Sequence, residues 1–167
     1  KRNTLEWLLY KKPSLIHSVS SDGYNLAHYA IEAENLNILR WLLDKKPSLI
    51  HSKTRDGETL AHYARIMDDD ILEWLLDKEP SLAHIADHTG KTVAQAAVDA
   101  DDTEMLPFIL SRGEGLISSV DNEGRTLAHT AAERCEEEIF EWLLENEPSL
   151  IHSVDNEGRN LAQCAFE

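Results

Sequence analysis

The sequence predicts an all-α repeat solenoid, in which short helices form pairs and the pairs stack along the chain. A five-residue phrase, first seen as Leu-Ala-His-Tyr-Ala, begins at Leu26, Leu60, Val93, Leu127 and Leu161. These positions are 34, 33, 34 and 34 residues apart. A second apolar phrase, usually Trp-Leu-Leu, keeps the same interval and begins at Trp7, Trp41, Trp74, Phe108 and Trp142. A fixed period of this length indicates that each unit buries its apolar face against its neighbours.

The first helix of a unit is predicted by a turn dipeptide and a capping residue. Asp22-Gly23 favours a tight turn, because Gly adopts positive φ without steric cost. The side chain of Asn25 can then accept a hydrogen bond from a free N–H at the start of a helix, and the equivalent residues are Thr59, Thr92, Thr126 and Asn160. The helix is expected over about 26–33, with Ala27 and Ala30 on a narrow face that lets helices approach closely.

The second helix is expected over about 36–44, after a polar break at Glu34-Asn35. Its apolar residues cover a wide stripe, so it should be buried on more than one side. Pro47 ends it, because the residue before a proline is driven out of the α region. Single helices of this length are marginal in water, so stacking must supply the stability.

The period also divides the chain. Full units are expected at 18–51, 52–84, 85–118 and 119–152, between partial units at 1–17 and 153–167, in a single domain. The second unit is one residue short between Ala64 and Ile71, which predicts a tightened turn. The last helix, from Leu161, is mostly apolar, so we expect it to fray or to pack on a segment outside this sequence.

These residues resemble the ankyrin repeat, a unit of about 33 residues with a β-turn, two helices and the signature T-P-L-H-x-A. The signature is matched most closely at 59–64 and 126–131, and the second-helix pattern at 38–43 and 139–144. The signature's proline and the family's glycine between the helices are absent. The resemblance covers essentially the whole chain. It implies an ankyrin-type stack of helix-turn-helix units joined by β-turn loops, and a role in binding other proteins.

Charge restricts the class of partner. The formal net charge of −15 is uneven, because residues 1–84 hold 11 Lys and Arg against 13 Asp and Glu, whereas 85–167 hold 5 against 18. Such a field repels nucleic acid and anionic lipid and attracts a basic partner. Alternatively, the acidic turns and outer faces serve only solubility.

Targeting and covalent features are sparse. No apolar run approaches the roughly 18 residues of a membrane span. The N-terminal residues lead directly into a predicted helix and do not resemble a signal peptide. Cys135 and Cys164 lack metal-ligand spacing, so we expect free thiols in a reducing compartment, the cytoplasm. The repeats are also similar to ankyrin arrays that intracellular bacteria deliver into host cells.

The residues that could carry chemistry form no catalytic or metal-binding pattern. Most histidines recur at two repeat positions, which favours a structural role: His28, His62 and His129, and His17, His51, His84 and His152. By the resemblance, the signature histidine bonds to backbone near the turn. The tryptophans are interpreted as a buried ladder. His84 and His88 lack further zinc ligands, and the acidic cluster at 99–104 lacks the order of a calcium loop. We therefore expect no enzyme, metal or cofactor.

Function is expected on the side chains that stacking does not use. By the resemblance, these lie at the turn tips and the ends of the first helices, along a concave groove. The candidate partner-binding residues are Asp22, Tyr24, Glu32, Arg55, Asp56, Glu58, Ile66, Met67, His88, Lys91, Asp99, Asn122, Arg125 and Arg134. Tyr24, Ile66 and Met67 are predicted anchors, because such side chains are typical of interfaces. Arg55, Lys91, Arg125 and Arg159 form a predicted row of charge along the tips.

The sequence favours a non-enzymatic module that binds another protein, and two alternatives stay open. The chain could be a spacer or targeting segment of a larger protein, such as a bacterial effector. It could also be a self-associating array, because open apolar ends allow weak end-to-end packing of an otherwise monomeric chain. Neither nucleic acid nor a membrane is expected as a partner.

Overall fold

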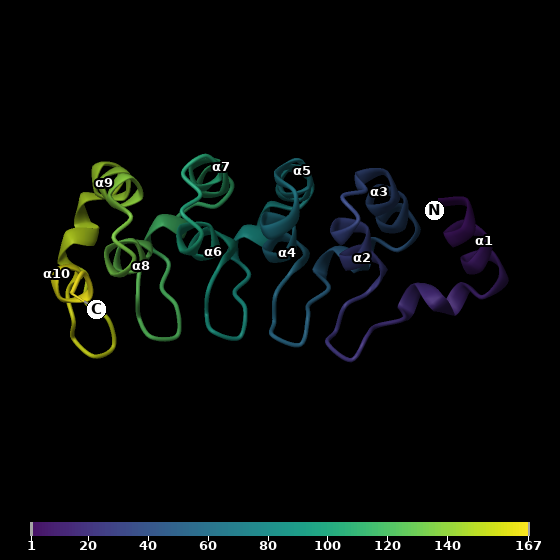
Figure 1. Cartoon of the computed structure of the whole chain (residues 1–167), viewed down its shortest axis with the longest axis horizontal. Coiled ribbons are helices and arrows are strands. Elements are labelled where there is room, and N and C mark those ends of the chain that lie inside the picture. The colour runs from purple at the N-terminus through teal and green to yellow at the C-terminus, as the bar shows by residue number, and fades with distance from the viewer. Residues whose placement is uncertain (1, 167) are drawn as a thin grey trace. The chain divides into compact units, whose positions relative to one another are not determined.

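The computed structural model describes residues 2–166, so Lys1 and Glu167, the ends of the predicted partial units, lie outside the described residues. The chain forms two compact units, one up to Leu72 and one from Glu73. Both units consist of paired helices joined by long turn loops (Figure 1). The predicted all-α stack of helix pairs is confirmed within each unit.

The first unit holds second and first helices in alternation. Its elements are α1 (Arg2–Lys11), the 3-10 helix η1 (Pro13–His17), α2 (Leu26–Glu32), α3 (Leu36–Lys45), the 3-10 helix η2 (Pro47–His51) and α4 (Leu60–Met67). The helix α5 (Asp69–Lys78) begins in this unit and ends in the second one. Within the first unit, α2 packs against both α3 and α4.

The second unit repeats the same arrangement. Its remaining elements are η3 (Pro80–His84), α6 (Val93–Asp99), α7 (Met105–Ser111), η4 (Leu116–Ser118), α8 (Leu127–Glu133), α9 (Glu137–Asn146), η5 (Pro148–His152) and α10 (Leu161–Cys164). Each first helix packs against its own second helix, α6 on α7 and α8 on α9. The first helices α6, α8 and α10 also pack side by side.

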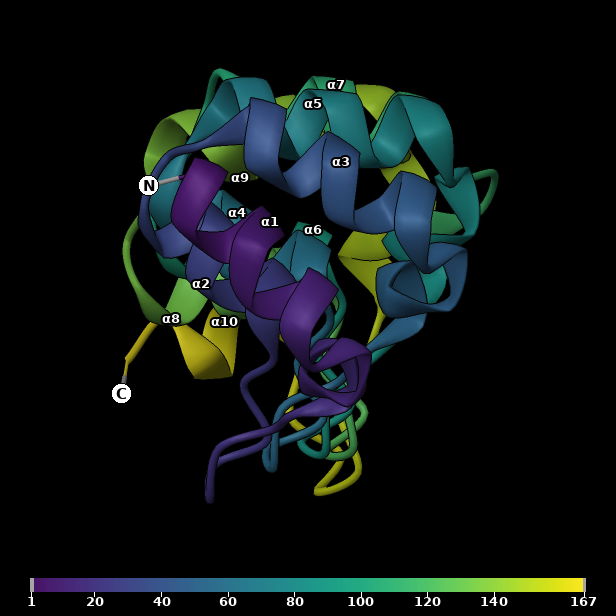
Figure 2. The same cartoon turned by 90° about the vertical axis from the view of Figure 1, so that its right-hand side faces the viewer.

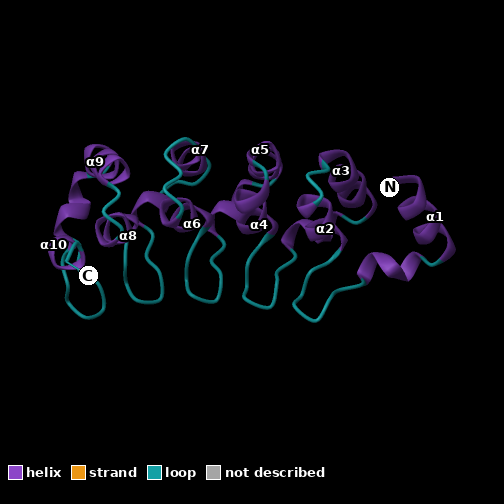
Figure 3. Ribbon diagram, viewed as in Figure 1, coloured by secondary structure: helices purple, strands orange, loops and turns teal. Residues whose placement is uncertain are grey.

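The turn loops are narrow fingers without a sheet. Figure 3 draws helices and loops over the described part of the chain, and backbone pairing there is limited to isolated bridges such as Val19–Asn25 and Lys53–Thr59. The predicted turn glycines adopt positive φ, 86° at Gly23 and 84° at Gly57. In each unit the fingers extend beyond the first helices, on the side away from the second helices (Figures 1 and 2).

Small residues on the first helices and leucines on the second helices build the core. Ala27, Ala30, Ala61 and Ala64 are buried, which confirms the predicted narrow face of the first helices. On the second helices the core side chains include Leu39, Leu42, Leu72, Leu75 and Leu143. Because alanine leaves the helix surface flat, the first helices can approach one another while the leucines fill the space above them.

The predicted buried ladder of tryptophans is wrong. Trp41, Trp74 and Trp142 are half-buried, and Trp7 is 58% exposed. The leucines beside each ring take the core positions, so the ring lies at the border between core and solvent. The ammonium group of Lys78 lies 5.4 Å from the ring centroid of Trp74, so a basic side chain covers the ring from the solvent side.

The 3-10 helices were not predicted from the sequence. Pro47 does end α3, but it also opens η2, because proline needs no N–H partner at a first helical position. Leu49 and Ile50 of this 3-10 helix are buried. The 3-10 helices after the later second helices also bury residues, whereas η1 after α1 buries none. Most of these segments therefore contribute to the core as well as connecting two repeats.

The turns between paired helices depend on single residues with positive φ. Glu34, Asp101 and Cys135 have φ of 48°, 55° and 59°, in place of the glycine that the family uses there. Between α4 and α5 only Asp68 intervenes, in an extended conformation with φ of −165°. The predicted tightening of the turn in the repeat at 52–84 is confirmed.

The last helix is short. The helix α10 ends at Cys164 after 4 residues, whereas α8 has 7. Leu161 and Cys164 are buried against the preceding first helix, but Ala165 and Phe166 are exposed. The shortening agrees with the expectation that this helix lacks part of its packing.

Candidate functional site

The signature histidines are structural, as predicted. The Nδ1 atom of His129 accepts a hydrogen bond from the backbone N–H of Thr126 at 3.2 Å. The Nε2 atom donates to the carbonyl oxygen of Arg159, 3.4 Å away in the next turn. Gln95 replaces the histidine in α6 and donates to the carbonyl of Arg125 at 3.0 Å. The side chain at this position therefore caps the start of its own helix and also bonds to the backbone of the next turn.

The imidazole of His28 is held neutral by its surroundings. Its Nδ1 accepts from the N–H of Asn25 at 3.2 Å, and the residue is fully buried. Burial lowers the pKa of His28 from 6.5 to about 4. A buried neutral imidazole whose Nδ1 already bonds to the helix cap stabilises the fold, and it cannot reach a substrate.

The turn tips form a hydrogen-bonded ladder within each unit. In the first unit, the N–H of Arg55 donates to the carbonyl of Asp22 at 2.8 Å. In the second unit, the N–H of Asn122 donates to the carbonyl of Thr89 at 3.0 Å, and that of Asn156 to Glu123 at 2.9 Å. The fingers therefore present their side chains at fixed spacings.

The basic residues of the predicted row of charge at the tips all form ion pairs. Arg125 forms ion pairs with Asp121, Glu123 and Glu133 at 3.0–3.1 Å. Arg159 lies 2.7 Å from Asp155. The remaining members pair in the same way, Arg55 with Asp22 and Lys91 with Asp99. The carboxylates belong to the same finger, to the helix that follows it or, for Arg55, to the neighbouring finger, so the tips do not offer an unmatched cationic strip.

A cluster of tyrosines lies in the first unit, at the base of its fingers. Tyr24 meets Tyr63 edge to face with ring centroids 5.3 Å apart, and its ring lies 6.5 Å from that of Tyr29. Tyr24 and Tyr63 are half-buried and Tyr29 is exposed. We call Tyr24, Tyr29 and Tyr63 the tyrosine cluster.

Carboxylates surround the tyrosine cluster. Burial, followed by the negative charges of Glu58, Asp22, Asp56 and Glu32, raises the pKa of Tyr24. Burial and the charge of Glu32 raise the pKa of Tyr63 in the same sense. The rings therefore lie in a negative field, which favours a cation above them.

Two apolar side chains are exposed at the end of α4. Ile66 is 60% and Met67 37% exposed, at the position where a first helix gives way to its turn. Glu32 occupies the equivalent end of α2 and is also exposed. The first unit thus combines aromatic, aliphatic and acidic groups on its finger side.

A polar cleft lies in the second unit between α6 and α8. It has a volume of about 390 Å³ and is lined by Lys91, Asp99, Arg125, Thr130, Glu133 and Arg134. Asp99 accepts from Lys91 and, at 3.0 Å, from Arg134. Arg125 donates to Glu133 at 3.0 Å. The buried hydroxyl of Thr130 has no hydrogen-bond partner. The cleft offers donors and acceptors of fixed position with nearly balanced charge.

The stacked pairs, capped first helices and finger ladders agree with one family. The profile described as ankyrin repeats, in three copies, matches residues 1–84 and 68–155. The chain belongs to the ankyrin repeat family. Ankyrin repeats generally serve as protein–protein interaction modules and are typically non-catalytic. A comparison with curated proteins gives no match.

The candidate residues of this ankyrin repeat chain fall into separate groups. The structure brings Asp22, Tyr24, Glu32, Asp56 and Glu58 together around the tyrosine cluster. It brings Lys91, Asp99, Arg125 and Arg134 together in the polar cleft. Asn122 is used in packing instead, since its side chain donates to the carbonyl of His88 at 2.9 Å. Tyr24 is half-buried, so it is less exposed than the sequence suggested.

Sequence reasoning missed Tyr29, Tyr63 and Thr130. All three belong to the repeated five-residue phrase, whose members were interpreted as structural. A signal was present, because the fourth position of the phrase varies: it reads Tyr29, Tyr63, Ala96, Thr130 and Cys164. In the first unit this position carries the exposed Tyr29 and the half-buried Tyr63, whereas Thr130 and Cys164 are buried at the same position in the second unit.

Other classes of site find little support in residues 2–166. That part of the chain holds no group of His, Cys, Asp and Glu able to bind a metal ion. Nor does any helix in it have the length and apolar character needed to cross a membrane.

Proposed function

We propose that this ankyrin repeat chain is a non-enzymatic recognition module that binds a partner protein through its finger tips and the exposed ends of its first helices. The observation that carries the proposal is the finger side of the first unit. The tyrosine cluster there is followed by the exposed Ile66 and Met67. Large apolar and aromatic side chains that the core does not use are the usual anchors of protein interfaces.

The partner chemistry that suits this surface is a basic segment. The cluster is bordered by four carboxylates, and a Lys or Arg over a tyrosine face gains both ion pairing and cation–π attraction. The polar cleft of the second unit would add directional hydrogen bonds, for which its paired charges are already in place. Attraction between opposite charges would also speed association.

The repeat boundaries at 18–51, 52–84, 85–118 and 119–152 are part of this proposal. Each range holds one finger, two helices and a following 3-10 helix. Both cysteines are free thiols, exposed at Cys135 and buried at Cys164, which supports the proposed reducing, cytoplasmic setting.

Capture from cell lysate on the immobilised chain tests the proposal. The double variant Ile66→Ser/Met67→Ser removes the exposed apolar side chains of α4 and should weaken retention of the bound protein about tenfold or more. Its thermal unfolding should change little, because neither side chain belongs to the core. Tyr10→Ser is the matched control, because it removes a more exposed aromatic side chain from a second helix. Equal retention by the wild type and the double variant would exclude this surface.

A further inference from the structure

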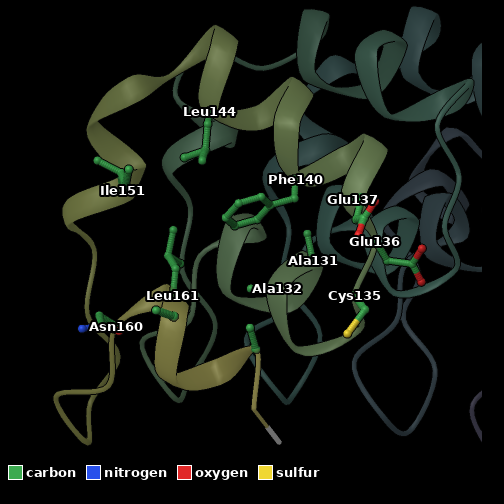
Figure 4. A pocket seen from close by; sticks show the side chains of 12 residues that line it. Ala131, Ala132, Cys135, Glu136, Glu137, Phe140, Leu144, Ile151, Asn160 and Leu161 are labelled. Carbon is green, nitrogen blue, oxygen red and sulfur yellow. The ribbon is translucent and has the colours of Figure 1, made fainter.

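The second unit ends in an apolar groove, shown in Figure 4. The groove has a volume of about 600 Å³ and lies between α8, α9, η5 and α10. Phe140, Leu144, Ile151 and Leu161 gather around it, and the exposed thiol of Cys135 and the carboxylate of Glu137 lie at one edge. We call it the terminal groove.

Two apolar side chains of this chain are exposed although the residues at the same repeat position elsewhere are buried. Ile151, beside the terminal groove, is 56% exposed, whereas Ile50 at the same position of the repeat is 7% exposed. Leu8 of α1 is 41% exposed, whereas its counterparts Leu42 and Leu143 are completely buried. Among residues 2–166, no second helix follows α10 to cover the groove, and no first helix precedes the second helix α1.

We propose that α1 of one copy of this chain docks in the terminal groove of a second copy, and pairs with α10 there as α9 pairs with α8. The occupant is defined by its sequence, because α1 carries the Trp-Leu-Leu phrase of the other second helices. In that register Leu8 takes the place that Leu143 has in its own pair, and it covers Leu161 as well as Ile151. The proposal is independent of the finger-side surface.

An ion pair inside the second unit supplies a template for the contact. Arg112, four residues after Phe108, pairs with Asp77, three residues after Trp74 in the preceding second helix. The same offsets from Trp7 and Trp142 lead to Lys11 and Glu145. When α1 docks beside α9, Lys11 of one copy therefore meets Glu145 of the other.

A second template connects the residue five positions after the tryptophan with the histidine of the preceding 3-10 helix. Within the first unit, the ammonium group of Lys46 bonds to Nδ1 of His17. Within the second unit, Gly113 stands so close to His84 that an added Cβ would lie 2.6 Å from its Nε2. Across the proposed contact this rule pairs Lys12 with His152.

Charge selects the same occupant. Residues 1–17 hold 4 Lys and Arg against 1 Glu, whereas 119–167 hold 3 against 12 Asp and Glu. A hydrogen bond with Asp101 and, to a lesser extent, burial raise the pKa of Glu136, so carboxyl groups are crowded at the groove's edge. The basic α1 relieves this crowding, and the acidic second helices α5 and α9 would increase it.

The contact is head to tail, so the size of the complexes distinguishes it from symmetric self-association. Two different surfaces meet, and a dimer keeps one free α1 and one free terminal groove, so complexes grow with concentration instead of stopping at a dimer. A symmetric dimer would use one surface twice and would stop at two chains.

Sedimentation velocity over a concentration series tests the proposal with two blocking variants. Leu8→Glu blocks α1 and Ile151→Glu blocks the groove, both at positions already exposed. Each variant alone should remain monomeric where the wild type forms larger species. An equimolar mixture of the two should form dimers and nothing larger, since one variant keeps the groove and the other keeps α1. Circular dichroism shows whether both variants are folded.

Charge variants supply a milder test. Lys11→Glu should weaken association about fivefold, and mixing it with Glu145→Lys should restore most of the loss. Tyr10→Ser and the Ile66→Ser/Met67→Ser variant should associate like the wild type, which separates this contact from the recognition surface. Alkylation of the exposed Cys135 should slow as complexes form, whereas Cys164 is buried in either state.

Two results would overturn the proposal. One is a wild-type chain that stays monomeric up to its solubility limit, which would mean that another chain segment or another protein occupies the groove. The other is a mixture of the two blocking variants that stays monomeric although both are folded and the wild type associates.

Discussion

The imidazole of the signature histidine joins two stretches of backbone, and this is its task at the scale of the residue. His129 accepts from its own cap residue and donates to the following turn. Both bonds require a neutral ring with the proton on Nε2. The same geometry that makes the residue useful for folding removes it from any catalytic role.

The buried state of His28 predicts a loss of stability in acid. Because its folded pKa of about 4 lies below the ordinary 6.5, the unfolded chain takes up the proton first as pH falls. Stability is therefore complete above pH 6.5 and declines from there towards pH 4. Between pH 7 and pH 5 we expect a loss of about 2 kcal/mol from this residue. Urea unfolding at both values checks it.

His28→Gln is the matched variant, because Gln95 already fills the position in α6. The variant should show a smaller difference between the two pH values than the wild type. A slope remains, since burial also lowers the pKa of His129. An unchanged pH dependence in His28→Gln would contradict the assignment.

The caps of the first helices differ in one respect that mutation can resolve. Thr59 accepts from the N–H of His62 and also bonds to its Nδ1 at 2.9 Å, whereas Thr92 forms a capping box with Gln95 in which its hydroxyl makes no hydrogen bond of standard geometry. We expect Thr59→Ala to lower the free energy of unfolding by about 1 kcal/mol and Thr92→Ala by clearly less. Denaturant titration of the two variants decides, and equal losses would show that the hydroxyl bond contributes nothing.

At the scale of the element, the fingers depend on close backbone contact. A Cβ at Gly90 would lie 2.4 Å from the backbone nitrogen of Asn122, whereas one at Gly158 would meet nothing within 4 Å. Both glycines have positive φ, so the two substitutions share the cost of that conformation and differ only in the contact.

Gly158→Ala should therefore cost about 1 kcal/mol. Gly90→Ala should cost roughly 1–2 kcal/mol more, because it also displaces the bond from Asn122 to Thr89. Thermal unfolding measures both. Similar losses for the two variants would mean that the finger ladder of the second unit adjusts without cost.

The sequence allowed most elements to be predicted, and the failures have physical causes. Caps, turn glycines and apolar phrases predicted the helix pairs to within a residue or two, because each is a local signal that recurs. The 3-10 helices were missed, since Pro47 was interpreted only as the end of α3. The tryptophans were misplaced because periodicity shows which face of a helix is apolar, but not how far along its edge burial extends.

At the scale of the whole molecule, the repeat leaves two kinds of surface for other proteins. One is the set of side chains that stacking does not use, such as Ile66 and Met67. The other is the pair of incomplete contacts at α1 and at the terminal groove. Sequence reasoning found the first kind in part, but ion pairing of Arg125 and of Arg159 depends on three-dimensional neighbours that no single phrase encodes.

Amide hydrogen exchange of the chain, alone and with a captured partner, tests the central claim most directly. The claim is that recognition uses the finger tips and the ends of the first helices. It predicts new protection around Tyr24, Glu58 and the end of α4, with the second helix α3 unchanged. Protection confined to α3, with the fingers exchanging as in the free chain, would contradict it.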